Sequence, residues 1–176
     1  KRATAAELLH EARALLPVIR AAGALLFIND RIDVALAAGA DGVHLGPHDI
    51  PVSAARRIAP AGFLIGCSTD DPLVAQRVEE EGADYIGCGA VFGTSTKDVG
   101  DEAIGTKRLD AVARAVSIPV VGIGGVTTAN VAAVAGTSAS GAAVVSGVMR
   151  ADDVGAAVAA LMAPFRKRTS QVGGPR

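Results

Sequence analysis

The sequence has few aromatic residues, only two cysteines and no long apolar run. Aromatic residues make up 3% of the chain and tryptophan is absent, although 50% of the residues are apolar. A core of Ala, Val, Ile and Leu is typical of strands buried on both faces with helices packed against them. Both cysteines, Cys67 and Cys88, lie inside apolar runs, so we expect reduced core thiols and no redox or metal role.

Charge and hydropathy exclude further classes of function. The formal net charge is −1 and the chain has no block of basic residues, which argues against binding to nucleic acid or to an anionic membrane. No apolar run approaches the roughly 18–20 residues of a membrane span. We therefore expect a cytoplasmic protein that acts on small molecules.

Short apolar runs alternate strictly with helical stretches. The opening helix begins with a capping box, Thr4 to Glu7, and ends at Gly23. The predicted strands are Ala24–Ile28, Gly42–Leu45, Phe63–Ile65, Asp84–Gly87, Pro119–Ile123 and Ala142–Val145. The predicted helices between and after them are Ile32–Ala38, Ser53–Ala59, Leu73–Glu81, Leu109–Val116, Ala129–Ala135 and Val154–Phe165. Such an alternation predicts a parallel sheet with helices outside it.

The fold class is therefore α/β, either an open doubly wound sheet or a barrel. We favour a TIM (β/α)8 barrel because of the residues in its turns. A helix opens the chain with no strand before it, so we expect the barrel to lack its N-terminal strand or strands here. We assign residues 1–165 to this domain and expect residues 166–176 to form a flexible tail.

Two aspartates follow neighbouring predicted strands, where barrels hold their active sites. Asp30 comes after the first strand and Asp49 after the second, and each precedes a helix. Helix capping is one interpretation, because Asp is favoured at N-caps. A metal pair is the other, because two carboxylates at one mouth repel unless a cation lies between them, and Mg²⁺ binds carboxylates together with phosphate oxygens.

Glycines after the last two predicted strands indicate a phosphate site. Gly124 and Gly125 follow the fifth strand, and Ser146 and Gly147 follow the sixth. Backbone N–H groups in these two turns, with the start of a short helix, form a recurring phosphate site in barrels, and glycine lets the backbone approach the phosphate. Two ordinary tight turns are the alternative.

The long segment Gly89–Gly105 has no apolar periodicity, which is typical of a binding loop. It contains Thr94, Ser95, Thr96 and Lys97, whose hydroxyls and ammonium suit a diphosphate; a solvated lysine is the alternative. We interpret His44, inside a strand, as a hydrogen-bonded core residue. The histidines and cysteines do not cluster, so no zinc site is predicted.

Five segments of the chain carry a family pattern. They are Phe27–Leu36 (FINDRIDVAL), Gly39–Gly46 (GADGVHLG), Gly82–Gly87 (GADYIG), Thr94–Lys97 (TSTK) and Ile118–Gly125 (IPVVGIGG). In this order they resemble the thiamine-phosphate synthases, over nearly the whole chain up to about residue 165. The resemblance implies that hydroxymethylpyrimidine diphosphate condenses with hydroxyethylthiazole phosphate to give thiamine phosphate and pyrophosphate.

The resemblance also implies roles for individual residues. Asp30 and Asp49 would hold Mg²⁺, the implied cofactor, on the diphosphate. The pyrimidine diphosphate would be bound by Lys1, Asn29, Ser68 and Lys97, with Asn29 and Lys97 as catalytic residues. The thiazole phosphate would be bound by Thr94 and Thr96, with Ser95 between them, and by Gly125, Val145 and Ser146. Its partners are thus phosphorylated small molecules, and the oligomeric state stays open.

Several positions depart from the family pattern. Pro47 stands where Gln is usual, Asp70 where His often follows Ser-Thr, and Gly93 where Pro is common. The Gln and Arg of the family's second strand are absent. The sister family of thiazole tautomerases is the nearest alternative, but it tends to lose the residues found here as Asp49 and Thr96. A phosphosugar isomerase or epimerase barrel and a non-catalytic phosphate-binding relic are further alternatives.

Overall fold

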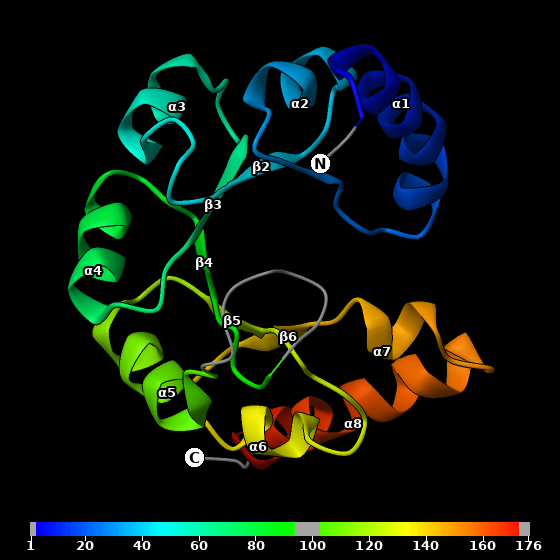
Figure 1. Ribbon diagram of the computed structural model, residues 1–176, viewed down its shortest axis with the longest axis vertical. Coiled ribbons are helices and arrows are strands. Elements are labelled where there is room, and N and C mark those ends of the chain that lie inside the picture. Colours follow the sequence, from blue (N-terminus) through cyan, green and yellow to red (C-terminus); the bar gives the residue numbers. More distant parts are fainter. Residues whose placement is uncertain (1–2, 94–102, 173–176) are drawn as a thin grey trace. The chain divides into compact units, whose positions relative to one another are not determined.

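The computed structural model describes residues 3–93 and 103–172, with side chains up to residue 166. The chain divides into two compact units. The first comprises Lys1–Ser68 with Arg77–Tyr85, and the second comprises Thr69–Gln76 with Ile86–Arg176. Figure 1 shows strands and helices alternating along the described chain, as the sequence predicts.

The strands are short and their order follows the chain. They are β1 (Phe27–Asn29), β2 (Gly42–Leu45), β3 (Leu64–Ser68), β4 (Tyr85–Cys88), β5 (Val120–Ile123) and β6 (Gly141–Ala143). The helices are α1 (Ala5–Ala21), α2 (Ile32–Ala38), α3 (Val52–Ile58), α4 (Pro72–Glu80), α5 (Gly105–Ala115), α6 (Val131–Ala135), α7 (Ser146–Met149) and α8 (Val154–Val172). Among the described residues no helix is long and apolar enough to cross a membrane.

In the first unit, β1, β2 and β3 are parallel neighbours. Val43, Leu45 and Ile65 are all at most 1% exposed, and they share one face of the strands, because Val43 is level with Ile65 and lies two residues from Leu45. Figure 1 shows α2 and α3 covering one face of these strands. The opposite face carries His44, level with Asn29 on β1 and with Gly66 on β3. The unit therefore buries one face of its strands in an aliphatic core and keeps polar side chains for the other.

In the second unit, β5 pairs in parallel with β4 on one side and with β6 on the other. Its core is made by fully buried aliphatic side chains from β4, from the segment after it, and from α5 and α6. They are Ile86, Val91, Leu109, Val112, Val131 and Val134. Both units thus have the composition expected for a core without tryptophan, with small branched side chains between parallel strands and helices.

The sequence predicts most elements within a few residues, and the differences have local causes. The capping box of α1 is present, because Thr4 accepts from the Glu7 amide and the Glu7 carboxylate accepts from the Thr4 amide. β1 begins three residues later than predicted, since the Leu26 amide donates to Asp41 Oδ2 at 2.7 Å. α8 runs on to Val172, so the tail expected from Arg166 begins inside a helix. Residues 173–176 lie outside the described residues.

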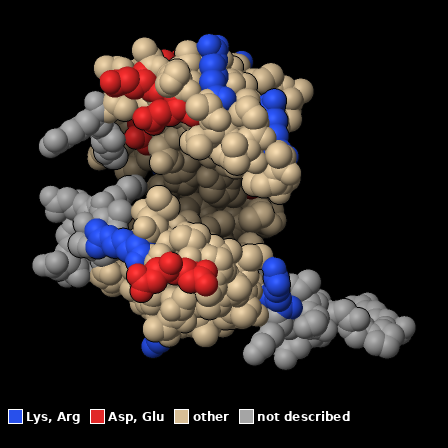
Figure 2. Space-filling model, turned by 90° about the vertical axis from the view of Figure 1, so that its right-hand side faces the viewer, with Lys and Arg blue, Asp and Glu red and all other residues tan. Residues whose placement is uncertain are grey.

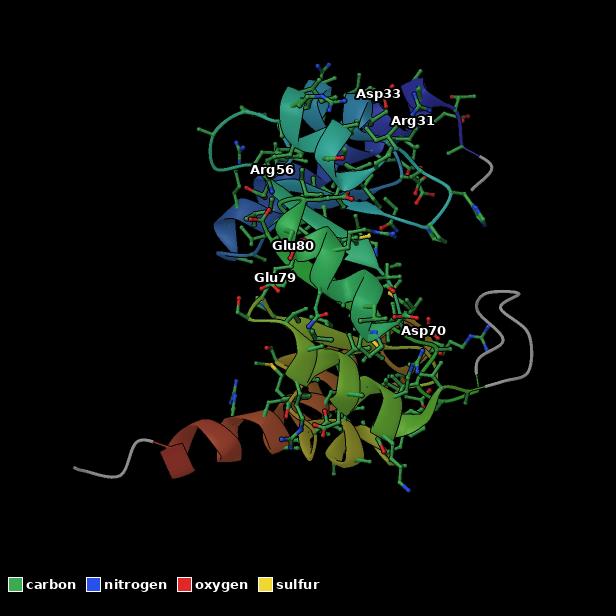
Figure 3. All side chains as sticks on the ribbon, turned by 90° about the vertical axis from the view of Figure 1, so that its left-hand side faces the viewer. Arg31, Asp33, Arg56, Asp70, Glu79 and Glu80 are labelled. Atoms are coloured by element: carbon green, nitrogen blue, oxygen red, sulfur yellow. The ribbon has the colours of Figure 1, made fainter. Side chains whose placement is uncertain are left out.

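Arg56 ties α3 to the turn before β4 in the first unit. Its guanidinium, labelled in Figure 3, donates to the carbonyl oxygens of Phe63 and Gly82 and pairs with the Asp84 carboxylate. The same carboxylate accepts from the Ile65 amide at 2.7 Å. These bonds lie at the amino-terminal ends of β3 and β4. In barrel folds this side of the strands contributes to stability, and the active site lies at the opposite, carboxyl-terminal ends.

Candidate functional site

Asp30 and Asp49 lie in the turns after β1 and β2, at the carboxyl ends of neighbouring strands. Helix capping does not account for their positions. The N-cap of α2 is Arg31 and that of α3 is Pro51. Asp49 Oδ2 instead accepts a hydrogen bond from the Gly46 amide at 2.6 Å, across its own turn. The N-cap interpretation of both aspartates is therefore wrong.

Asp30 has an unusual backbone conformation. Its φ is 66°, in the left-handed region, and it is the only residue besides glycines with positive φ among the described residues. The Asp30 amide donates to the His44 carbonyl at 2.9 Å, which continues the β1–β2 ladder one residue beyond the strand. Left-handed non-glycine residues are uncommon and concentrate at functional sites. Asp30 is part-buried and Asn29, just before it, is exposed.

Two carboxylates in neighbouring turns are of the side-chain type that a hard divalent cation such as Mg²⁺ takes in proteins. Magnesium commonly takes one or two carboxylates and completes its shell with water and phosphate oxygens. No cluster of three or more His, Cys, Asp or Glu side chains that could hold a metal occurs in the part of the chain that the structure describes.

Ser68 ends β3 and faces the same side of the strands as His44. Its hydroxyl is 2.8 Å from His44 Nε2, and His44 Nδ1 is 2.9 Å from the Tyr85 hydroxyl. These two contacts confirm that His44 is hydrogen-bonded, as predicted, but the residue is part-buried and does not belong to the core. Burial raises the pKa of Tyr85 to about 12. Sequence reasoning did not identify Tyr85, whose pairing with His44 spans 41 positions of the chain.

In the second unit, the turn after β5 is built from two left-handed glycines. Gly124 has φ 95° and Gly125 has φ 62°. A Cβ on Gly125 would come within 2.4 Å of the Gly93 carbonyl oxygen and within 2.8 Å of Phe92 Cβ. Asn130 fixes the turn, because its side chain donates to Gly125 O at 2.9 Å and accepts from the Thr127 amide at 2.8 Å. Only glycine fits this position without moving backbone.

The short helix α7 follows β6 directly, as the barrel-type phosphate site requires. It begins at Ser146, and Val145 is its N-cap. A Cβ on Gly147 would lie 2.9 Å from Val144 Cγ1 and 3.1 Å from Val126 O, so this turn is also closely packed. The structure places the predicted residues Gly125, Val145 and Ser146 after the two paired strands β5 and β6.

The segment that contains four of the predicted residues, Thr94, Ser95, Thr96 and Lys97, lies outside the described residues, as does Lys1. The chain on both sides of the segment is held in the second unit. Phe92 N donates to Gly124 O at 3.0 Å on one side. Ile104 N donates to Ala90 O at 2.9 Å and Gly105 N to Val91 O at 3.1 Å on the other.

The remaining polar residues after β3 serve structural roles. Asp71 Oδ1 accepts from the Leu73 and Val74 amides at the start of α4, and Arg108 Nε donates to the Asp70 carbonyl at 2.6 Å. Asp70 itself is exposed (Figure 3). Sequence reasoning did not identify Arg108, which lies one residue before the predicted helix Leu109–Val116 and inside the observed helix α5.

Both cysteines are buried and free, as predicted. Burial raises the pKa of the Cys67 thiol, and it raises that of Cys88 to about 12, with a smaller contribution from Asp70. A thiol with a raised pKa is a weak nucleophile at neutral pH. On the face in Figure 2, acidic and basic side chains form small groups on a largely uncharged surface, and one basic group adjoins an acidic one.

Known proteins match this chain over most of its length. A family model described as thiamine monophosphate synthase matches residues 1–148. The thiamine-phosphate synthase of Methanoculleus marisnigri is 48% identical over 161 residues, covering 92% of this chain and 76% of the relative. That of Chlorobium luteolum is 44% identical over 163 residues, covering 93% of this chain and 77% of the relative. The chain thus spans about three quarters of the length of both relatives.

Solved structures agree with the sequence relatives. A thiamine phosphate pyrophosphorylase from Pyrococcus furiosus shares 40% identity at a TM-score of 0.82, covering 99% of this chain and 81% of that one. A 3-hexulose-6-phosphate synthase reaches a TM-score of 0.67 at 22% identity, covering 88% of this chain and 80% of that one, and it shows a shared fold alone. The predicted α/β fold of the TIM-barrel type is confirmed, with six strands in the described residues. The chain belongs to the thiamine monophosphate synthase family.

Proposed function

We propose that the chain condenses hydroxymethylpyrimidine diphosphate with hydroxyethylthiazole phosphate, releasing pyrophosphate and forming thiamine phosphate. Family membership supports the reaction class. The observation that carries the assignment to residues is the placement of Asp30 and Asp49 at the carboxyl ends of β1 and β2, at positions other than the helix N-caps. This arrangement suits a Mg²⁺-bound diphosphate.

Two groups of residues would bind the two substrates. In the first unit, Asp30 and Asp49 would hold Mg²⁺, and Asn29 and Ser68 would contact the pyrimidine diphosphate, with Lys1 added from outside the described residues. In the second, the Gly125 turn and the Val145–Ser146 turn would hold the thiazole phosphate, with Thr94, Ser95 and Thr96 from the segment after Gly93. Backbone N–H groups at such turns bind phosphate without a charged side chain.

The chemistry would need stabilisation of the leaving group more than a strong base. Mg²⁺ held by Asp30 and Asp49 would neutralise charge on the diphosphate, an effect worth several kcal/mol in comparable enzymes. Lys97 and Asn29 would add hydrogen bonds to the departing pyrophosphate, whose negative charge grows as the C–O bond breaks. The electron-rich aminopyrimidine can share the positive charge left on its methylene, and the thiazole nitrogen then bonds to that carbon. The protein mainly positions two partners and excludes water.

The direct test incubates the intact protein with both substrates and Mg²⁺ and follows thiamine phosphate and pyrophosphate. We expect product in equal amounts, loss of product when the metal is chelated, and recovery when Mg²⁺ is restored. A folded protein that forms no product overturns the proposal. Interconversion of thiazole isomers in the same samples would then identify a tautomerase, and its absence would favour the non-catalytic alternative. The cytoplasmic location stays a prediction.

A further inference from the structure

His44 lies between two hydroxyl groups in the first unit. Its Nδ1 is 2.9 Å from Tyr85 Oη and its Nε2 is 2.8 Å from Ser68 Oγ. The imidazole therefore uses both ring nitrogens, and the three side chains form one continuous hydrogen-bond network, the Ser68–His44–Tyr85 network. This network ends at Ser68, the last residue of β3, at the edge of the strands where Asp30 and Asp49 also lie.

Close packing over two glycines fixes the Tyr85 end of the Ser68–His44–Tyr85 network. A Cβ on Gly66 would lie 2.2 Å from Tyr85 Cζ and 2.5 Å from its hydroxyl oxygen, so the tyrosine ring lies directly over the glycine. The ring meets Phe27 edge-on with centroids 5.3 Å apart, and Phe27 in turn fills the space over Gly42. Close packing on both sides fixes the position of the Tyr85 hydroxyl and, through it, the orientation of the imidazole.

The hydrogen bonds of the Ser68–His44–Tyr85 network can be donated in either of two directions. If the Tyr85 hydroxyl donates to Nδ1, a neutral His44 carries its proton on Nε2 and donates to Ser68 Oγ, which leaves the serine O–H free to donate elsewhere. If the direction is reversed, the Ser68 hydroxyl donates its only proton to His44 and can only accept hydrogen bonds from a ligand. Because Tyr85 keeps its proton with a pKa of about 12, it is able to donate. A diphosphate only accepts hydrogen bonds, so the first direction is the one that suits it.

We propose that His44, oriented by Tyr85, is a positioning residue that turns the Ser68 hydroxyl proton toward the diphosphate of the pyrimidine substrate. The proposal rests on the proposed function, since it requires a diphosphate at the end of β3. Neither His44 nor Tyr85 would touch the substrate. Their effect would pass through one oxygen atom, Ser68 Oγ, and this makes the proposal testable by comparing variants with and without that oxygen.

The first test is a double-mutant cycle on the intact protein. Tyr85→Phe removes one hydroxyl and keeps the ring over Gly66. We expect it to raise KM for the pyrimidine diphosphate about 3- to 10-fold, the range for one lost hydrogen bond, with kcat changed much less. In a Ser68→Ala background the same change should alter KM less than about 2-fold, because coupled residues are not additive. Equal fold-changes in both backgrounds would overturn the proposal and leave Tyr85 a packing residue.

A conservative variant gives a second comparison. His44→Gln places an amide N–H near the position of Nε2, so it should retain more affinity for the pyrimidine diphosphate than His44→Leu. If the two variants bind equally poorly while both remain folded by circular dichroism, the donor to Ser68 is not what matters and the proposal fails.

A spectroscopic test separates this proposal from the proposed function. Nitrogen spectra of histidine-labelled protein report which ring nitrogen carries a proton, and His44→Gln assigns the signal among the three histidines. We expect Nε2 of His44 to be protonated, and we expect Tyr85→Phe to reduce that preference. A protonated Nδ1 with a bare Nε2 would overturn the proposal even in an active enzyme. Absence of thiamine phosphate with a protonated Nε2 would overturn the proposed function instead.

Discussion

Asp49 Oδ2 accepts a hydrogen bond from the backbone nitrogen of Gly46 over 2.6 Å. This bond orients the carboxylate across its own turn, so the carboxylate does not cap the N-terminus of α3. A Cβ on Gly46 would lie 3.1 Å from the same oxygen, so the turn is close-fitting around the aspartate. The carboxylate therefore has one oxygen engaged by backbone and a second with which it could bind a cation.

Removing either aspartate should abolish turnover. We expect Asp30→Ala and Asp49→Ala to lower kcat/KM on the order of 100-fold or more, because each removes a proposed metal ligand worth several kcal/mol. Asp33→Ala is the matched control, since Asp33 is exposed and pairs with Arg31 beside it (Figure 3). Product formation across a Mg²⁺ titration measures the effect. Near-normal rates in both variants would remove the metal assignment.

Lys97 should act on pyrophosphate departure. We expect Lys97→Ala to slow the single-turnover rate by roughly 100-fold, the typical cost of losing one group that stabilises developing negative charge. Lys107→Ala, an exposed lysine in the first turn of α5, is the control. Rapid mixing of enzyme in excess over the pyrimidine diphosphate gives the rate. An unchanged single-turnover rate for Lys97→Ala would rule out this role.

Gly125 can be compared with a glycine of the same conformation in open space. Gly125 and Gly23 have φ of 62° and 66°, but a Cβ on Gly23 meets nothing within 4 Å. Gly23→Ala should lose about 1–2 kcal/mol of unfolding free energy, the cost of a left-handed residue, and Gly125→Ala should lose more because of its additional backbone clash. Only Gly125→Ala should also raise KM for the thiazole phosphate, since its methyl group collides with Gly93 and Phe92. Equal KM values for the two variants would argue against a phosphate site at this turn.

Arg56 should matter for stability and not for chemistry. Its hydrogen bonds to Phe63, Gly82 and Asp84 are partly shielded from water. We expect Arg56→Ala to reduce the unfolding free energy by about 2–3 kcal/mol, because it leaves Asp84 without its charged partner. Arg57→Ala, at the exposed neighbouring position, should change it by less than about 0.5 kcal/mol. Urea denaturation measures both, and similar values would contradict the prediction.

Cys88 should make the fold sensitive to alkali. Its pKa rises from 9.0 to about 12 on folding, chiefly through burial. The folded state therefore keeps a proton that the unfolded chain loses, so the free energy of unfolding should fall as pH rises from about 9 toward 12. Tyr85 acts in the same direction. Urea denaturation at several pH values should show a shallower fall for Cys88→Ala than for the parent, and identical slopes would refute the assignment.

Sequence patterns predicted the elements that rest on local rules. The capping box of α1 and the bounds of α2 follow from residues within one turn of each other, and the structure reproduces them. The start of β1 depended on Asp41, fifteen positions away, which takes the Leu26 amide. The start of α5 was missed by four residues because Gly105 bonds back to Val91. Such boundaries are set by tertiary contacts that periodicity does not contain.

The candidate site shows the same division. Placing polar residues after strands located Asp30, Asp49, Ser68, Gly125 and Ser146 at the ends or in the turns where the structure has them. The choice between capping and another role for the aspartates required the observed N-caps at Arg31 and Pro51. The connection of Ser68 to Tyr85 through His44 joins three strands, and no spacing rule along the chain predicts it.

The close fit of Tyr85 over Gly66 constrains which residues can occupy these two positions together. With alanine at position 66, its methyl carbon would lie 2.2 Å from the ring, so a tyrosine could not take its present position above it. Glycine at position 66 is therefore the permissive residue for this ring position, with a cost in chain entropy. With the ring in place, alanine at position 66 would require the ring to move. Positions 66 and 85 should therefore vary together among relatives, as should positions 27 and 42.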